Sequence, residues 1–299
     1  MRSATIMSTI AALICFGSVA EAQHDGRKQD FHPSVSPDGE QAVFYSYREP
    51  NFPDLFLIDL ATGETTNLTN SEDLWEIEPE WSPTDNRIAY SRGPSMGSLE
   101  IVVHDLDAGE ITPVGHGINA SWSPDGTRLI WTEDAAFHIA DVETGSVHIV
   151  DTIEIDGQVS EPAWGENDHT LIFMVGSGGD DNNERYDVFW HDMETGETRQ
   201  LTDTINQETH PRLVDNGTTL IFAGALESRE PSLYRMDLET GAIGRLFTEE
   251  LAPLYTYFPS VGPDGRTIYF EAGDWTAGQF DLYAVPSDGS EDPRALSAH

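Results

Sequence analysis

The chain has 299 residues, with 53 acidic side chains against 15 lysine and arginine side chains, and a formal net charge of −38 at pH 7. We therefore expect no nucleic acid or anionic lipid as a partner, because a phosphate backbone requires a basic surface patch. A single cysteine, Cys15, excludes a disulfide within the chain.

Residues 1–22 have the features of a secretory signal peptide. Arg2 precedes an apolar segment over Ile6–Val19, and Ala20-Glu21-Ala22 is an A-x-A cleavage site. The segment is too short, and too rich in serine and threonine, for a stable membrane span. We expect cleavage after Ala22, no membrane insertion and a periplasmic or secreted bacterial protein. Residues 23–31 are expected to form a polar N-terminal tail.

A hairpin motif then recurs six times. Its clearest copy is Ser121–Trp131 (SWSPDGTRLIW), in which an Asp-Gly turn separates two apolar strands. Asp-Gly is a strong hairpin signal because glycine adopts the positive φ of the turn without steric cost. The first turn residues lie 41 to 49 residues apart, at Ser36, Ser82, Ser123, Gly165, Val214 and Gly262. A period of about 40–50 residues made only of strands and turns is typical of propeller blades.

Each copy continues with a third strand that ends in an acidic turn, such as DLFLIDLATGE over 54–64, and with a short fourth strand, such as TRQLT over 198–202. No segment shows a sustained apolar period of 3.6 residues. The sequence therefore predicts an all-β fold over 32–299, a six-bladed β-propeller with four antiparallel strands per blade. The blades are expected to start near residues 32, 78, 119, 161, 210 and 258.

The ends of the repeat array predict how the ring closes. The chain enters the first blade on an inner strand and leaves the last blade on an outer strand, Pro293–Ser297. Blades 1 and 6 should therefore meet by face packing and not by a shared strand. Each blade has two apolar faces, so its stability is expected to depend on the complete ring.

The repeat, WSPDG followed by D-L-x-T-G-E and R-L-T, resembles the WD40-like repeats of the TolB propeller family over 32–299. Glu78–Pro83 (EPEWSP) and Arg199–Thr202 (RQLT) are close matches. The resemblance implies a periplasmic, partner-binding role in an envelope complex that includes a peptidoglycan-associated lipoprotein. TolB has an α/β domain before its propeller, whereas about nine residues precede the first blade here. Similar repeats occur in oligogalacturonate lyases, which use a metal, and in propellers followed by a serine peptidase domain, which would have to lie beyond His299.

One position in each inner strand is expected to line the mouth of the central channel. This is the residue before the strand's proline, and blade 3 has Ala120 in place of that proline. The six residues are His32, Glu78, Asn119, Glu161, His210 and Phe258. They are the candidate ligand- or partner-binding residues. The simplest alternative is that they cap the strand starts in a wet channel.

Six blades would place His32 opposite Glu161 and Glu78 opposite His210. Histidine and carboxylate side chains on one ring suit a divalent cation, so these four residues are also candidate metal ligands. Asp180 and Asp181, in the acidic loop Gly176–Asp187, offer oxygen ligands of the kind that calcium takes. The spacing there is not that of an EF-hand, and a surface loop is the favoured interpretation.

Two further features have weaker functional interpretations. Gly93–Gly97 matches the G-x-S-x-G nucleophile pattern but lies between strands with no helix behind it, so we assign it no catalysis. The loops Tyr45–Asp54 and Glu271–Asp281 contain aromatic and arginine side chains that suit a protein or glycan contact or pack over blade edges. Those side chains are Tyr47, Arg48, Phe52, Trp275 and Phe280.

The leading hypothesis is an exported, non-enzymatic and monomeric propeller that binds an envelope protein or glycan at the channel mouth, with no cofactor. The alternative is a metal-dependent carbohydrate lyase or lactonase-type enzyme, with Ca²⁺ or Mn²⁺ held by the histidine and glutamate side chains of the ring. A third interpretation is a structural propeller within a larger assembly. Bound metal would separate the second from the other two.

Overall fold

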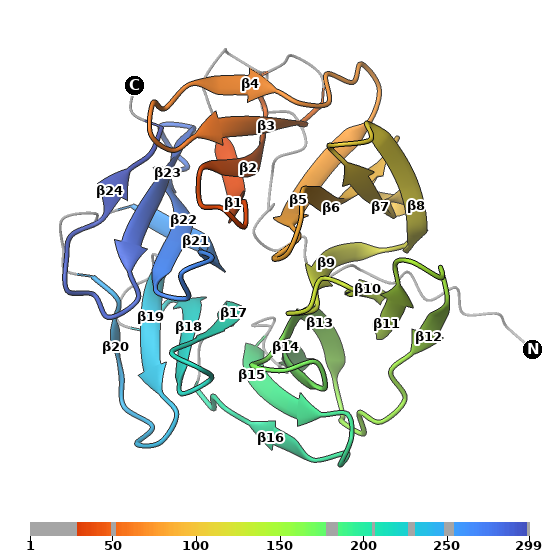
Figure 1. Ribbon diagram of the computed structural model, residues 1–299. Helices are drawn as coiled ribbons and strands as arrows, with labels where there is room; N and C mark the ends of the chain where they lie inside the picture. The colour runs from red at the N-terminus through yellow and green to blue at the C-terminus, as the bar shows by residue number, and fades with distance from the viewer. Residues whose placement is uncertain are drawn as a thin grey trace, which may run out of the picture.

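Six four-stranded antiparallel sheets stand around a central axis, as Figure 1 shows. This computed structural model describes residues 29–48, 52–177, 185–204, 207–226, 231–247 and 254–297. The predicted six-bladed, all-β propeller is confirmed, and in the described ranges the one short helix is the 3₁₀ turn η2 (Met96–Ser98). The expected signal peptide and the residues Asp180 and Asp181 lie outside those ranges. No described helix is long and apolar enough to cross a membrane.

Every sheet is built from one continuous segment, with its strands in chain order from the axis outward. The inner strands are β1 (Asp30–Val35), β5 (Trp75–Trp81), β9 (Ile118–Trp122), β13 (Gln158–Trp164), β17 (Glu208–Val214) and β21 (Tyr255–Val261). The second strands are β2 (Gln41–Ser46), β6 (Arg87–Gly93), β10 (Arg128–Glu133), β14 (Thr170–Ser177), β18 (Thr219–Gly224) and β22 (Thr267–Asp274). Because β1 begins at Asp30, the expected polar tail ends earlier than residue 31.

The third and fourth strands complete each blade toward the rim. The third strands are β3 (Asp54–Asp59), β7 (Glu100–Asp105), β11 (Ala136–Asp141), β15 (Arg185–Asp192), β19 (Ser232–Asp237) and β23 (Gln279–Pro286). The outer strands are β4 (Thr65–Asn67), β8 (Glu110–His116), β12 (Val147–Ile149), β16 (Thr198–Gln200), β20 (Ile243–Arg245) and β24 (Arg294–Ala295). The first two strands of blade 1 are almost wholly buried, whereas β12 is wholly exposed.

The repeated acidic turn between the third and fourth strands has a local cause. Asp59 Oδ1 accepts hydrogen bonds from the backbone N–H groups of Ala61 and Thr62, and Gly63 then adopts a φ of 73°. An aspartate that binds the backbone two residues ahead stabilises such a turn, and glycine adopts its positive φ without strain. The same two bonds recur at Asp105, Asp141, Asp192 and Asp237.

The tryptophans at the end of three inner strands join neighbouring blades. Trp122 Nε1 donates to the Glu80 carbonyl and Trp164 Nε1 donates to the Ser121 carbonyl, each at 3.1 Å. Arg87 and Arg128 lie over the rings of Trp122 and Trp164 as cation–π partners. These side chains therefore serve blade packing.

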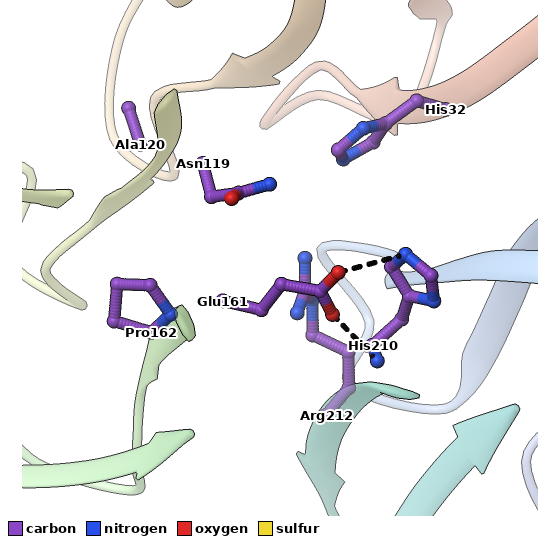
Figure 2. Close-up of a pocket in the computed structure, with 7 residues that line it drawn as sticks. All are labelled: His32, Asn119, Ala120, Glu161, Pro162, His210 and Arg212. Carbon is purple, nitrogen blue, oxygen red and sulfur yellow. Dashed lines mark hydrogen bonds and ion pairs between the residues drawn. The ribbon is translucent and has the colours of Figure 1, made fainter. Parts of the chain in front are cut away.

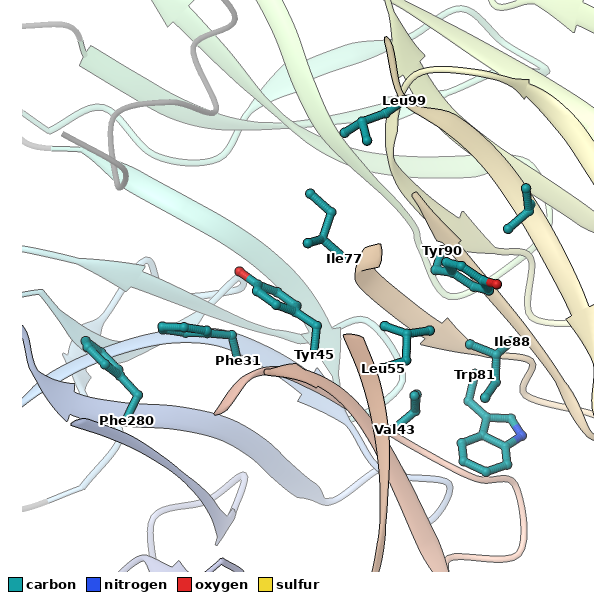
Figure 3. Close-up of a cluster of buried hydrophobic side chains, with 11 residues drawn as sticks. Phe31, Val43, Tyr45, Leu55, Ile77, Trp81, Ile88, Tyr90, Leu99 and Phe280 are labelled. Carbon is teal, nitrogen blue, oxygen red and sulfur yellow. The ribbon is translucent and has the colours of Figure 1, made fainter. Parts of the chain in front are cut away.

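Blades 6 and 1 close the ring without sharing a strand, as predicted. In Figure 1 blade 6, in blue, lies directly beside blade 1, in red and orange. Phe280 of β23 packs on Phe31 of β1 with ring centroids 5.1 Å apart, and a continuous buried cluster extends from there into blade 2, as Figure 3 shows. Face packing of apolar side chains therefore holds the two ends of the array together.

The aromatic loop residues flagged in the sequence take part in this closure. Trp275 stacks on Phe31 at 6.1 Å, and Tyr47 meets Phe31 edge to face at 6.0 Å. Phe280 is fully buried, and Arg48 forms an ion pair with the buried Asp30. These contacts favour the blade-edge packing interpretation over an exposed contact surface.

Candidate functional site

All six inner strands are interrupted at the same place. The antiparallel ladder skips two residues in each strand, and the first skipped residue has a left-handed φ between 49° and 56°. These left-handed residues are His32, Glu78, Asn119, Glu161, His210 and Phe258, the six candidate residues of the sequence. A residue other than glycine costs about 1–2 kcal/mol in this conformation, so the surrounding structure must enforce it.

In every second blade, the backbone N–H of the left-handed residue donates a hydrogen bond to a buried glutamate side chain of the preceding blade. Glu78 Oε2 accepts from Asn119 N at 2.9 Å, and Glu161 Oε2 accepts from His210 N at 2.8 Å. The third such hydrogen bond, or cap, is made by Glu271 on β22, whose Oε2 accepts from His32 N at 2.8 Å. Each bond joins one blade to the next, so the three carboxylates tie blade 2 to 3, blade 4 to 5 and blade 6 to 1.

Glu271 was missed in the sequence. It lies outside the repeated position, and its signal is a charged residue in the buried middle of strand β22, directly after the apolar run Ile268–Phe270. It is only 1% exposed, and burial raises the pKa of its carboxyl well above the usual value, against the opposing effect of the His32 N–H. Glu271 therefore closes the ring by hydrogen bonding at the same boundary where Phe280 closes it by packing.

Five of the six left-handed residues gather at the axis, and one pair of them, Glu161 and His210, is joined side chain to side chain. His210 Nε2 lies 3.2 Å from Glu161 Oε1. The Phe258 ring stacks on the His32 ring, with centroids 4.7 Å apart, and contacts the His210 ring at a tilt, with centroids 3.9 Å apart. The bonded pair thus comes from neighbouring blades and not from opposite ones. Glu78 contacts Asn119 and Ser91 instead of the opposite His210.

A small cavity of about 20 Å³ remains between these side chains, and Figure 2 shows its lining. The lining residues are His32, Asn119, Ala120, Glu161, Pro162, His210 and Arg212. A space of roughly 10–15 Å³ or more on this measure holds one water-sized group. Glu78 does not line it, and His32, Glu78 and His210 are each more deeply buried than a channel-mouth position suggests.

Arg212 is the site residue that the sequence analysis overlooked. It follows His210 by two residues on β17, where the other five blades have Ser34, Glu80, Ser121, Ala163 and Ser260. A lone basic side chain at a repeat position of a chain with so few cations was the available signal. Among the described residues the guanidinium makes one hydrogen bond, from Nη1 to the Pro211 carbonyl at 2.9 Å.

Burial and Arg212 set the charges around the cavity. Burial raises the pKa of Glu161 to about 7, and the His210 N–H and Arg212 oppose that rise. Burial and then Arg212 lower the pKa of His32 to about 3, while burial, His32 and Arg212 hold the pKa of His210 well below its usual value. Both imidazoles are therefore neutral at pH 7, and Arg212 is the fixed positive charge.

Two buried polar atoms at the cavity have no hydrogen-bond partner in the described structure. They are His32 Nδ1 and Asn119 Oδ1. Most buried polar atoms in proteins are paired with protein groups or ordered water. The cavity therefore presents an open guanidinium, an unpaired amide oxygen and an unpaired ring nitrogen to one small group.

The metal-binding hypothesis remains a prediction. Within the described ranges, no three histidine, cysteine, aspartate or glutamate side chains lie close enough together to hold a metal ion. Arg212 also lies beside Glu161 and His32 and would repel a cation there. The donor set as it stands therefore fits a cation poorly.

The G-x-S-x-G segment has no nucleophile geometry. Ser95 precedes the three-residue η2, and its Oγ pairs with Ser98 Oγ at 2.9 Å on an exposed turn. A nucleophile elbow requires a strand, a tight turn and an α-helix, with a histidine within reach. The described surroundings of Ser95 provide neither that helix nor a histidine bond.

The left-handed backbone can be tested at Asn119, whose side-chain oxygen has no partner to lose. Asn119→Val should lower the free energy of unfolding by about 1–2 kcal/mol, because a β-branched residue tolerates this φ poorly. Asn119→Gly, which accepts the φ, should remain within about 1 kcal/mol of the parent. Urea unfolding measures both, and equal stability of the two variants would show that the φ is not strained.

Fold and cavity together define a class, a six-bladed β-propeller with an open, polar, Arg-containing site on its axis. No protein-family model matches the chain. Among solved structures it is similar to TolB from Acinetobacter baumannii, with 17% identity, a TM-score of 0.61, and coverage of 92% of this chain but 66% of TolB. The chain thus spans less than two thirds of that protein.

Two other solved structures share the fold. An oligogalacturonate lyase in complex with manganese has 18% identity and a TM-score of 0.58, over 90% of this chain and 77% of the lyase. The β-propeller domain of the Trilobed protease from Pyrococcus furiosus, described as having an open velcro topology, has 14% identity and a TM-score of 0.59, over 91% and 98%. At such identities the likeness establishes the propeller fold alone.

Proposed function

We propose that this protein is an exported, non-enzymatic propeller of the bacterial envelope that binds a protein or glycan component at the axial end where the inner strands begin. The single observation that carries the proposal is the ring of left-handed residues, which surrounds a cavity with unpaired polar atoms. Strained residues cluster where a protein binds or reacts. The A-x-A motif at residues 20–22 and the likeness to TolB support the cellular setting.

The arrangement favours binding over catalysis because the carboxyl groups of the site are already engaged within the protein. Both Glu161 oxygens contact His210, one through the ring and one through the backbone N–H. Glu78 and Glu271 likewise cap backbone N–H groups. Side chains that stabilise the scaffold hold a rigid site, and rigid sites suit recognition.

A metal-dependent lyase or lactonase is the second candidate, and one observation favours it. The Glu161 carboxyl has a pKa of about 7, in the range that suits a general acid or base near neutral pH. Elemental analysis separates the two candidates. Manganese or calcium at one ion per chain, lost in Glu161→Gln, would move the assignment to the enzyme.

Site-specific photo-crosslinking tests the binding proposal. A benzophenone amino acid in place of Phe258, which lies between His32 and His210, should yield a defined adduct in cells that export the protein. The matched control carries the same group at Glu194, in an exposed turn between the third and fourth strands at the other end of blade 4. Equal adducts at both positions, or none at Phe258, would contradict the proposal.

A further inference from the structure

We propose that the axial cavity is a carboxylate-binding site, in which Arg212 pairs with the carboxylate and Asn119 and His32 orient it. The inference deepens the proposed function and rests on it, because it names the chemical group that the axial site recognises. It assigns this role to Arg212, a residue with no counterpart in the other five blades.

Arg212 has hydrogen-bonding capacity that the protein leaves unused. A guanidinium has five N–H donors in a planar fork that matches a carboxylate, and only its bond to the Pro211 carbonyl is made among the described residues. The two nearest acids are engaged elsewhere. Glu161 contacts His210 with both oxygens, and Glu80 Oε1 accepts from Trp122 N and Ser121 Oγ.

The remaining lining fits the second oxygen of a bound carboxylate. Figure 2 shows Asn119 and His32 facing each other across the cavity, with Glu161 turned away toward His210. The Asn119 amide and the neutral His32 ring each have a donor available once the side chain adopts the appropriate orientation or tautomer. His32 is 8% exposed and its Nδ1 has no partner, so a ligand that satisfied it would remove a desolvation cost.

Cavity size limits the ligand to one small group. About 20 Å³ holds one water-sized group, such as an oxygen of a carboxylate, but no sugar ring. A larger molecule must therefore place its carboxylate on the axis while the rest of it lies toward the channel mouth. Phe258, whose ring contacts both histidine rings, forms an apolar wall there.

The surrounding acids make the site responsive to pH. Glu161, Glu78 and Glu80 all lie near the cavity, and burial raises the pKa of each carboxyl. His32 and His210 stay neutral, and Arg212 stays charged. As the pH falls from 8 to 6, protonation of Glu161 removes a negative charge near the Arg212 guanidinium. A ligand carboxylate is still ionised at pH 6 and should therefore bind more tightly there.

The net charge of −38 repels an anionic ligand at long range. Long-range repulsion of an anion is screened by salt, whereas the short contact to a half-buried Arg212 is screened much less. Binding should therefore persist at 0.3 M salt, unlike adsorption of an anion on an exposed basic patch.

Sodium acetate is the probe, titrated against sodium chloride at constant ionic strength while NMR follows the ring resonances of His32 and His210. We expect saturable shifts with acetate only. Arg212→Gln should weaken binding about tenfold or more, the usual effect of losing a charge-assisted pair. Asn119→Ala, which lies outside the Glu161–His210 pair, should weaken acetate binding by a smaller factor. It provides a second test of the site if Arg212→Gln misfolds.

Arg199→Gln is the matched control, since Arg199 lies over Trp190 on the exposed strand β16. It should bind acetate like the parent. Three results would overturn the carboxylate assignment. They are resonance shifts that chloride reproduces, acetate binding that is unchanged in folded Arg212→Gln, and no acetate binding up to about 0.1 M, a concentration that detects even a weak site. Adduct formation at Phe258 would be unaffected by that failure, so the two proposals fail separately.

A short peptide with a free C-terminus, and the same peptide as its amide, identify the source of the carboxylate. Tighter binding of the acid than of acetate, with none of the amide, assigns the site to the end of an extended chain. Equal binding of acid and acetate assigns it to small free acids. Binding of the amide as tight as that of the acid would overturn the assignment.

Discussion

Truncation of Phe280 to alanine should lower the free energy of unfolding by about 3–5 kcal/mol, the usual range for a fully buried phenylalanine. Phe280 is 0% exposed and packs on Phe31 across the boundary of blades 6 and 1. Trp275 lies 4.4 Å from it and depends on the same contact. No shared strand supports this boundary, and among the described residues its main-chain pairing is one isolated parallel bridge between Gln29 and Phe280, so the lost packing is compensated little by main-chain hydrogen bonds.

Phe280→Leu is the control because it keeps most of the apolar volume, and it should cost less than about 1.5 kcal/mol. Urea unfolding followed by tryptophan fluorescence measures both variants, since Trp275 reports on the boundary directly. A loss below about 1 kcal/mol for Phe280→Ala would show that the ring is held closed elsewhere, and the Glu271 cap to His32 would then be the first bond to test.

The second large effect concerns Glu161 and pH. In the unfolded chain its carboxyl has the ordinary pKa of 4.5, and in the folded protein burial raises the pKa to about 7. The folded state therefore binds more protons than the unfolded state between these pH values. The stability that protonated Glu161 contributes is complete below about pH 4.5 and is lost as the pH rises through 7, a loss of about 3 kcal/mol.

Glu161→Gln removes this titration while keeping an acceptor for the His210 N–H. The stability of the variant relative to the parent should therefore increase by about 3 kcal/mol between pH 4.5 and pH 8.5. His32 and Glu271, which make no bond to Glu161, titrate in both proteins, so their slopes cancel in the difference. Parallel stability profiles of parent and variant would show that Glu161 keeps an ordinary pKa in the folded state.

The blades were predictable because their signals are local. An Asp-Gly turn between alternating apolar strands defines a hairpin within about a dozen residues, and Ser121–Trp131 is such a unit in the structure as β9 and β10. The absence of a shared strand also followed from chain order alone. The sequence singled out the position before the inner-strand proline as a candidate binding position, whereas its left-handed backbone could not be inferred from residue type.

The site was only partly predictable because its contacts join distant segments. Facing positions on the ring suggested His32 with Glu161 and Glu78 with His210, whereas the bonded pair is Glu161 with His210, from adjacent blades. Glu271 and Arg212 stand at positions that the repeat does not mark. Nothing in the local sequence indicates that Glu271 accepts a hydrogen bond from His32 N or that the Arg212 guanidinium keeps unused donors.

The number of blades, their order and the way the ring ends meet follow from the repeat, because strand period and turn chemistry act over a few residues. Tertiary structure alone decided the charge of Glu161, the neutrality of His32 and the availability of Arg212. Those properties depend on burial and on the electric field of neighbouring charges. The neighbouring charges come from strands that are far apart in the sequence, such as β13 and β17, which begin about 50 residues apart. A side chain's partners on the axis are set when the ring closes.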